Sequence, residues 1–214
     1  MTRIEQNRNP MSISEPYKKL LLIAGVILLT ADLAFTFVQH YYMLLDGDMA
    51  AVIVPCETFN KMHSHPFGLK AALNHELYAG TNRFFSHKMM MEYFRDITPL
   101  FQQLAGCIKG IYLSCAFIKV MTQAFLIYLL SVIISGRRSP LRPEWLVAAL
   151  IITPLFQSYG YYESIGIIDK SITYVFFYAL PLVFVILFFL PFFSDRKLHP
   201  LHILYLLPIS IVNV

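Results

Sequence analysis

The sequence predicts an all-α protein, a polytopic bundle of transmembrane helices with two amphipathic helices in its first outer loop. Hydrophobic residues make up 57% of the 214 residues and charged residues only 14%, whereas a soluble globular domain carries about 25% charged residues. The apolar residues form long runs, and about 20 consecutive apolar residues are enough to cross a bilayer as a helix. Basic residues gather between alternate runs, which is typical of multi-pass membrane proteins.

The N-terminal segment 1–19 is polar and is predicted to be a cytoplasmic tail, followed by a membrane domain over 20–214. The first apolar run, 20–45, is long enough to span the membrane. It is longer than the apolar core of a signal peptide, and no small-residue cleavage site follows it. We therefore expect it to remain as an uncleaved first span.

The segment 46–104 is predicted to be a long outer loop with two short amphipathic helices lying on the membrane. Ser64-His65-Pro66 is typical of a helix start, because proline is tolerated in the first turn. A second helix is expected after Gly80-Thr81-Asn82, with charged residues such as Lys88, Glu92 and Arg95 on one face. The apolar faces consist of Leu69, Leu73 and Leu77 in the first helix and Met90, Phe94 and Ile97 in the second.

Four further apolar runs follow the loop. The runs at about 108–134, 145–162 and 171–193 each have the length of a spanning helix. The last run, 201–214, is too short to cross and contains Pro208, which would kink it. We therefore expect this span to be incomplete, so that missing C-terminal spans or a partner subunit would complete the bundle.

The distribution of basic residues predicts the orientation. They gather before the first run (Arg3, Arg8, Lys18, Lys19), between the second and third (Arg137, Arg138, Arg142) and between the fourth and fifth (Arg196, Lys197). The positive-inside rule places these three segments in the cytoplasm. The segments 46–104 and 160–170 then face outward, and the protein is predicted to be a multi-pass protein of a bacterial inner membrane or a plasma membrane.

Composition also limits the partners. No basic run is long enough for nucleic-acid binding, so the lipid bilayer is the expected surrounding and no nucleic acid is expected. Cys56, Cys107 and Cys115 are too few and too scattered for a disulfide framework or a zinc site. They are interpreted as apolar or loop residues.

Asp46-Gly47-Asp48 is the foremost candidate for chemistry, because two acids at the mouth of a span are costly to hold there. In an extended chain, side chains at i and i+2 share a face. Both carboxylates could then bind one divalent cation such as Mg²⁺ or Mn²⁺, or one could act as a general base. The alternative is that both are interfacial acids that merely end a helix.

Two further groups of polar residues lie in the predicted outer segments. Glu163 and Asp169 belong to a segment rich in tyrosine and glycine, which suits a sugar or head-group surface; alternatively, Asp169 caps a helix or pairs with Lys170. Arg83, His87 and Lys88 lie in one short stretch and could hold a phosphate. The alternative for this stretch is a solvated basic face at the lipid head groups.

Polar residues also occur inside the predicted spans. Asp32 lies deep in the first span, with Gln39 and His40 near its end. An acid at that depth is costly unless it is paired. Lys119 in the second span is a candidate partner, and a neighbouring helix is the alternative.

The layout of about the first 110 residues resembles the GT-C superfamily of integral-membrane glycosyltransferases. The resemblance rests on a cytoplasmic N-terminus, one span, the acidic Asp46-Gly47-Asp48 at its outer end and a long loop with amphipathic helices. It implies a polyprenyl-phosphate-linked sugar as donor and a loop acid as catalytic base or metal ligand. It differs from the superfamily in size, since such enzymes have more spans.

Under this resemblance, Asp46 or Asp48 would deprotonate the acceptor hydroxyl, and Arg83, His87 or Lys88 would stabilise the departing lipid phosphate. Glu163 and Asp169 would bind substrate. The competing interpretation is a non-enzymatic multi-span protein, such as a transporter part or an assembly subunit. In that case Asp32, Glu163 and Asp169 would line a polar pathway, and activity would depend on the acids inside the membrane.

Overall fold

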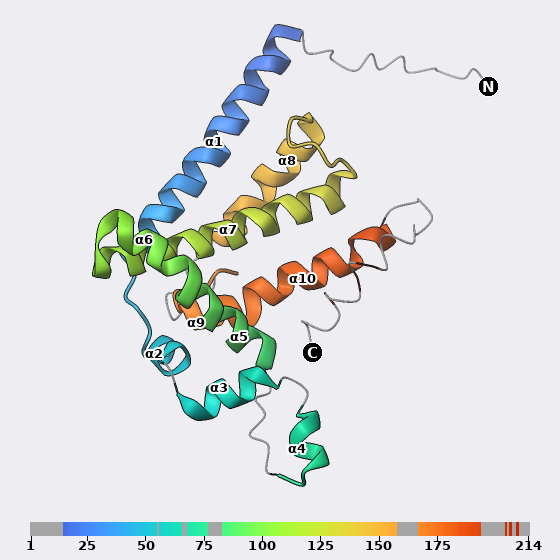
Figure 1. Cartoon of the computed structure of the whole chain (residues 1–214). Coiled ribbons are helices and arrows are strands. Elements are labelled where there is room, and N and C mark those ends of the chain that lie inside the picture. Colours follow the sequence, from blue (N-terminus) through green and yellow to red (C-terminus); the bar gives the residue numbers. More distant parts are fainter. Residues whose placement is uncertain are drawn as a thin grey trace, which may run out of the picture.

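The computed structural model describes residues 15–54, 56–65, 68–76, 83–157 and 167–193, and positions 204, 206 and 209. Every regular element in these residues is a helix (Figure 1), which confirms the predicted all-α class. Three helical stretches are long and apolar enough to cross a membrane: α1 (Glu15–Tyr41), α7 (Cys107–Ser135) and the stretch Ile172–Phe193. They indicate a membrane protein.

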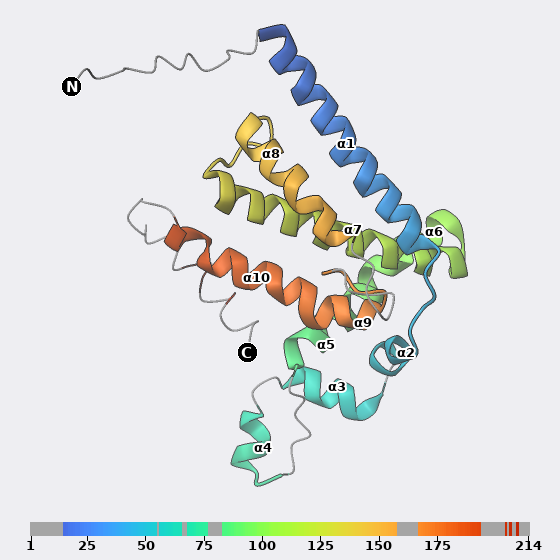
Figure 2. The same cartoon turned by 180° about the vertical axis from the view of Figure 1, so that it is seen from behind.

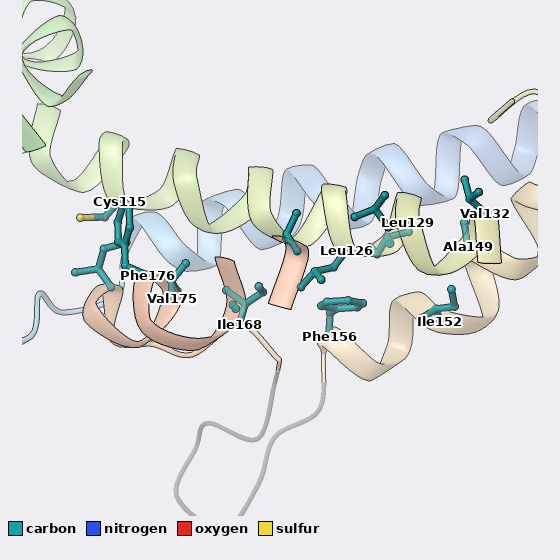
Figure 3. Packing of buried hydrophobic residues seen from close by; sticks show 14 of the residues in the cluster. Cys115, Leu126, Leu129, Val132, Ala149, Ile152, Phe156, Ile168, Val175 and Phe176 are labelled. Carbon is teal, nitrogen blue, oxygen red and sulfur yellow. The ribbon is translucent and has the colours of Figure 1, made fainter. Parts of the chain in front are cut away.

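Helix α7 is the central element. It has 29 residues, so at 1.5 Å per residue it is about 44 Å long. It contacts α1, α6 (Thr98–Ala105), α8 (Pro143–Ile152) and α10 (Leu180–Phe189), and Figures 1 and 2 show these helices around it from two sides. Its buried side chains lie between α7 and the neighbouring helices in Figure 3, where Cys115, Leu126, Leu129 and Val132 are labelled.

Two glycines allow helices to approach each other closely. A Cβ atom at Gly25 in α1 would lie 2.6 Å from Leu146 Cδ2 in α8, so the absence of a side chain brings these helices together. A Cβ atom at Gly110 in α7 would lie 2.4 Å from Gln102 Cα in α6. Gly106 joins α6 to α7 with φ +85°, a left-handed conformation that favours glycine.

The predicted spans agree with the helices to different degrees. The predicted run 108–134 corresponds to α7, and the predicted run 171–193 corresponds to α9 (Ile172–Tyr174), η3 (Val175–Ala179), α10 and η4 (Leu190–Phe193), which follow one another without a break. The first span begins and ends about five residues earlier than predicted, at Glu15 and Tyr41.

The third predicted span, 145–162, is shorter than expected. Helix α8 ends at Ile152 and continues only as the 3₁₀ turn η2 (Thr153–Phe156), giving a shorter apolar helix. Pro154 explains the change, because proline removes an intrahelical hydrogen bond and clashes with the carbonyl of residue i−4. The remainder, 158–162, lies outside the described residues, as does most of the predicted run 201–214.

The predicted loop segment contains more helices than the two expected. They are α2 (Gly47–Ile53), α3 (Glu57–Ser64), α4 (Leu69–Leu73), α5 (Phe84–Glu92), the π-helical η1 (Tyr93–Ile97) and α6. The expected helix start at Ser64 is wrong, because α3 ends there. Helix α4 has only five residues, with Leu69 and Leu73 exposed, and Leu77 lies outside the described residues.

The second expected amphipathic helix corresponds to α5, η1 and α6, but most of its apolar face packs against protein. Met90 is 0% exposed and Phe94 is 8% exposed. The Phe94 ring lies 6.5 Å from the ring of Phe176 in η3. The prediction that this face lies on the membrane is therefore wrong at Met90 and Phe94, while Ile97 is partly exposed.

Candidate functional site

Asp46 begins helix α2 as its N-cap. Its backbone is extended (φ −80°, ψ 153°), and its Oδ1 atom accepts a hydrogen bond of 2.7 Å from the backbone N–H of Met49. This is a preferred role for aspartate, since the first N–H groups of a helix have no intrahelical partner. Asp48 lies in the first turn of α2 and is exposed. The extended arrangement, in which both carboxylates would share a face, is therefore not found.

Asp46 also binds the start of the helical stretch Ile172–Phe193, more than 120 residues away. Its Oδ2 atom accepts hydrogen bonds from Ser171 Oγ at 2.7 Å and from the backbone N–H of Thr173 at 3.2 Å. Its Oδ1 atom accepts a further bond from Thr173 Oγ1 at 2.9 Å. With the Met49 bond, each carboxylate oxygen accepts two hydrogen bonds, which fills its lone pairs.

These contacts determine the protonation of Asp46. Burial, the largest effect, raises the pKa of the carboxyl, but the hydrogen bonds from Ser171, Thr173 and Met49 together outweigh it. The pKa of Asp46 is therefore lowered, because hydrogen bonds to the charged form stabilise it. Asp46 is a carboxylate at neutral pH and a weak proton acceptor.

Asp169 binds the backbone of Ser171, the residue whose side chain binds this carboxylate. Its Oδ1 atom accepts a hydrogen bond of 2.7 Å from the backbone N–H of Ser171. Ser171 is the N-cap of α9, with its Oγ accepting from the backbone N–H of Tyr174 at 3.3 Å while donating to Asp46. Asp169 thus shapes the turn that carries Ser171, rather than pairing with Lys170 as one interpretation proposed.

Lys119 approaches the same turn from α7. It is 2% exposed, and its Nζ donates a hydrogen bond to the backbone carbonyl of Lys170. Its charge interacts with Asp169 and Asp46. The expected pairing of Lys119 with Asp32 is wrong. Asp32 Oδ1 instead accepts a hydrogen bond of 3.2 Å from Gln157 Nε2, which also donates to Thr36 Oγ1 at 2.6 Å.

The predicted basic group is only partly brought together. Arg83 Nη2 donates to Tyr178 Oη at 2.7 Å, and its guanidinium carbon lies 4.7 Å from the centroid of that ring and 5.1 Å from that of Phe177. The His87 ring lies 4.6 Å from Phe177. Lys88 instead pairs with Glu92 at 3.9 Å. Arg83 and His87 therefore form one cation–aromatic cluster, and Lys88 lies apart from it.

The carboxylate and the cation–aromatic cluster share one support. Asp46 binds Thr173, and Arg83 binds Tyr178, five residues further along the same helical stretch, about 7 Å at 1.5 Å per residue. Helix α2 contacts both α5 and α9, and α5 contacts η3 (Figure 2). Both groups thus lie at one end of the helices. This end, which contains Asp46, Arg83, Thr173 and Tyr178, is here named the Asp46 end. Glu163 lies outside the described residues.

The divalent cation expected at Asp46 and Asp48 stays a prediction. No group of three or more His, Cys, Asp or Glu side chains in them is arranged to hold a metal ion. Both oxygens of Asp46 already accept two hydrogen bonds each, so a cation such as Mg²⁺ would be held by Asp48, with water and substrate oxygens as its other ligands.

Ser171 and Thr173 are not among the site residues predicted from the sequence. A serine directly before an apolar run is a signal for an N-cap, so the helix start at Ser171 was readable. The hydrogen bond between Ser171 and Asp46 could not be predicted, because no pattern in either segment indicates a contact with the other. Comparisons with protein-family models, with curated proteins and with solved structures find no match to this chain.

Proposed function

We propose that the chain is a GT-C-like glycosyltransferase, a multi-pass membrane protein that transfers a sugar from a polyprenyl-phosphate donor. In this proposal the N-terminus is cytoplasmic, and the Asp46 end faces outward, with the loop helices at the membrane surface.

The observation that carries the proposal is the contact between Asp46 and Ser171–Thr173. It joins an acidic turn after the first span to the start of a later span, which is an arrangement suited to a site at a membrane surface. A half-buried aspartate with four hydrogen bonds is held rigidly, and rigid support is what a catalytic group beside it needs.

The two acids have different roles in the proposed reaction. Asp48 is exposed and lies two residues after Asp46, so it is the general base that removes the proton of the acceptor hydroxyl. The acceptor oxygen then forms a bond to the anomeric carbon, while the bond from that carbon to the phosphate oxygen breaks. Asp46, with its lowered pKa, orients the turn that carries Asp48.

The cation–aromatic cluster receives the departing phosphate. The Arg83 guanidinium is always charged and suits a phosphate, and the His87 ring contacts the same Phe177 ring. The rings of Phe177 and Tyr178 hold the guanidinium in place and offer apolar surface to the lipid chain. Asp169, which accepts from the backbone of the same Ser171 that binds Asp46, binds the sugar in this proposal.

The test is sugar transfer from a labelled polyprenyl-phosphate donor in membranes that contain the chain. Asp48→Asn should lower transfer by about 100- to 10,000-fold, the usual cost of losing a general base. Asp46→Asn should also lower it, by loosening the turn. Asp96→Asn is the matched control, because Asp96 is an exposed acid of the same loop paired with Arg95. Transfer that is equal in the wild type and both variants would reject the proposal.

A second candidate function is a non-enzymatic transporter part or assembly subunit. It is favoured by polar side chains inside the apolar helices: Asp32 with Gln157 and Thr36, and Gln123, which is 0% exposed and has no hydrogen-bond partner among the described residues. Such groups often mark ion or substrate pathways. If this function is correct, Asp32→Asn should abolish proton flux across the proteoliposome membrane, measured with an enclosed pH-sensitive dye, and Asp48→Asn should not.

A further inference from the structure

Lys119 has no role in the proposed reaction, yet its burial is costly. It is one of the largest fully buried side chains among the described residues and lies within the apolar helix α7. Removing an ammonium group from water is unfavourable unless other groups replace the lost hydration. Leucine or methionine would fill the same space without that cost, so we expect Lys119 to have a role beyond filling space.

The hydrogen bond of Lys119 is directed to one turn. Its Nζ donates to the carbonyl of Lys170, and its charge interacts with Cys115 on its own helix, with His40 in α1, and with Asp169 and Asp46. Lys170 is flanked by Asp169, which accepts from the Ser171 backbone N–H, and by Ser171, whose Oγ donates to Asp46. One hydrogen bond from α7 thus fixes the middle of the turn from which Asp46 is bound.

Hydrogen bonds join this turn to helix α2, beside the packing of buried Met49, Ile168 and Ile172. Asp46 receives one hydrogen bond from its own helix and three from Ser171 and Thr173. Lys119 places those donors by attaching their backbone to α7, and its positive charge favours the nearby carboxylates in a region of low dielectric constant.

We propose that Lys119 is a positioning residue for the Asp46 end: it holds residues 169–173 where Ser171 and Thr173 can bind Asp46, and so fixes α2 and Asp48. Its contribution to catalysis rests on the proposed glycosyl transfer, whereas the positioning itself does not. A hydrogen bond to a charged group contributes enough to change a local opening equilibrium about 10- to 100-fold.

The experiment is hydrogen–deuterium exchange of the full chain in lipid nanodiscs. Lys119→Met should raise the exchange of residues 46–54 and 167–174 by about tenfold or more, and leave α8 unchanged. Lys119→Arg, which retains a charged donor, should restore most of the protection. Lys109→Met is the matched control, because Lys109 is an exposed lysine on the same helix. Exchange in Lys119→Met equal to that of the control, or a Lys119→Arg variant as open as Lys119→Met, would overturn the proposal.

A measurement on the wild type protects the test against a variant that fails to fold. Amine acetylation followed by mass spectrometry should modify Lys109 at least about tenfold faster than Lys119, because only a transient opening exposes Lys119. Equal rates would overturn the proposal without any variant. Selective opening in Lys119→Met together with no sugar transfer by the wild type would support positioning and reject the glycosyltransferase. Sugar transfer by the wild type together with unchanged exchange in Lys119→Met would support the glycosyltransferase and reject positioning by Lys119.

Discussion

Asp46 and Asp48 are two residues apart, but their surroundings are different. Asp46 is half-buried and accepts four hydrogen bonds, whereas Asp48 is exposed in the first turn of α2. Of the two aspartates, Asp46 therefore holds two distant segments of the chain together, and Asp48 faces solvent. This division supports the choice of Asp48, rather than Asp46, as the proposed base.

The lowered pKa of Asp46 predicts a pH dependence of stability. Because the pKa is lower in the folded protein than in the unfolded chain, where it is about 3.9, the stabilisation is fully present above that value and is lost as pH falls through the folded pKa. Asp46→Asn should thus lower the melting temperature at pH 7, and the difference from the wild type should shrink below about pH 4. Melting curves of both proteins in one detergent check this. A difference that is constant from neutral to acidic pH would contradict the assigned hydrogen bonds.

At the scale of single elements, sequence patterns predicted helices well and their partners poorly. Length and apolar composition are local properties, so α7 was predicted within about one residue at each end. The spacing of Met90 and Phe94 predicted an apolar face on the membrane, whereas protein covers these residues, because periodicity does not say whether protein or lipid covers an apolar face. The Asp46–Ser171 contact joins segments 125 residues apart and depends on how the helices pack.

The α6–α7 hairpin depends on the absence of a side chain at Gly110. A Cβ atom there would lie 2.4 Å from Gln102 Cα, so Gly110→Ala must push α6 away from α7 and should cost about 1–3 kcal/mol. Gly47→Ala is the control, because a Cβ atom at Gly47 has nothing within 4 Å. Thermal unfolding of both variants measures the difference. A Gly110→Ala protein as stable as the control would show that the two helices are not in close contact.

At the scale of the whole molecule, the bond between Asp46 and Ser171 brings the residues after α1 next to the start of α9. In the orientation predicted from basic residues, both of these segments face outward. That orientation stays a prediction, which rests on the charge of short loops. The early end of α8, where Pro154 interrupts the helix, was not predicted from the sequence.

Labelling of single cysteines tests the orientation. In a background without Cys56, Cys107 and Cys115, a cysteine in place of exposed Lys70 should react with a membrane-impermeant maleimide added outside intact cells. A cysteine in place of exposed Ser139 should react only after the cells are opened. The opposite pattern would place the Asp46 end in the cytoplasm and reject the proposed outward-facing site.

Chemical rescue of the proposed base is the most direct test of the account. Asp48→Ala should reduce transfer of labelled sugar from a polyprenyl-phosphate donor by about 100- to 10,000-fold, and added formate should restore part of it, because a small carboxylate can replace the missing base at an exposed position. Asp46→Ala should not be rescued, since formate cannot rebuild a carboxylate bound to Ser171 and Thr173. Undiminished transfer by Asp48→Ala would contradict the assignment of Asp48 as the base.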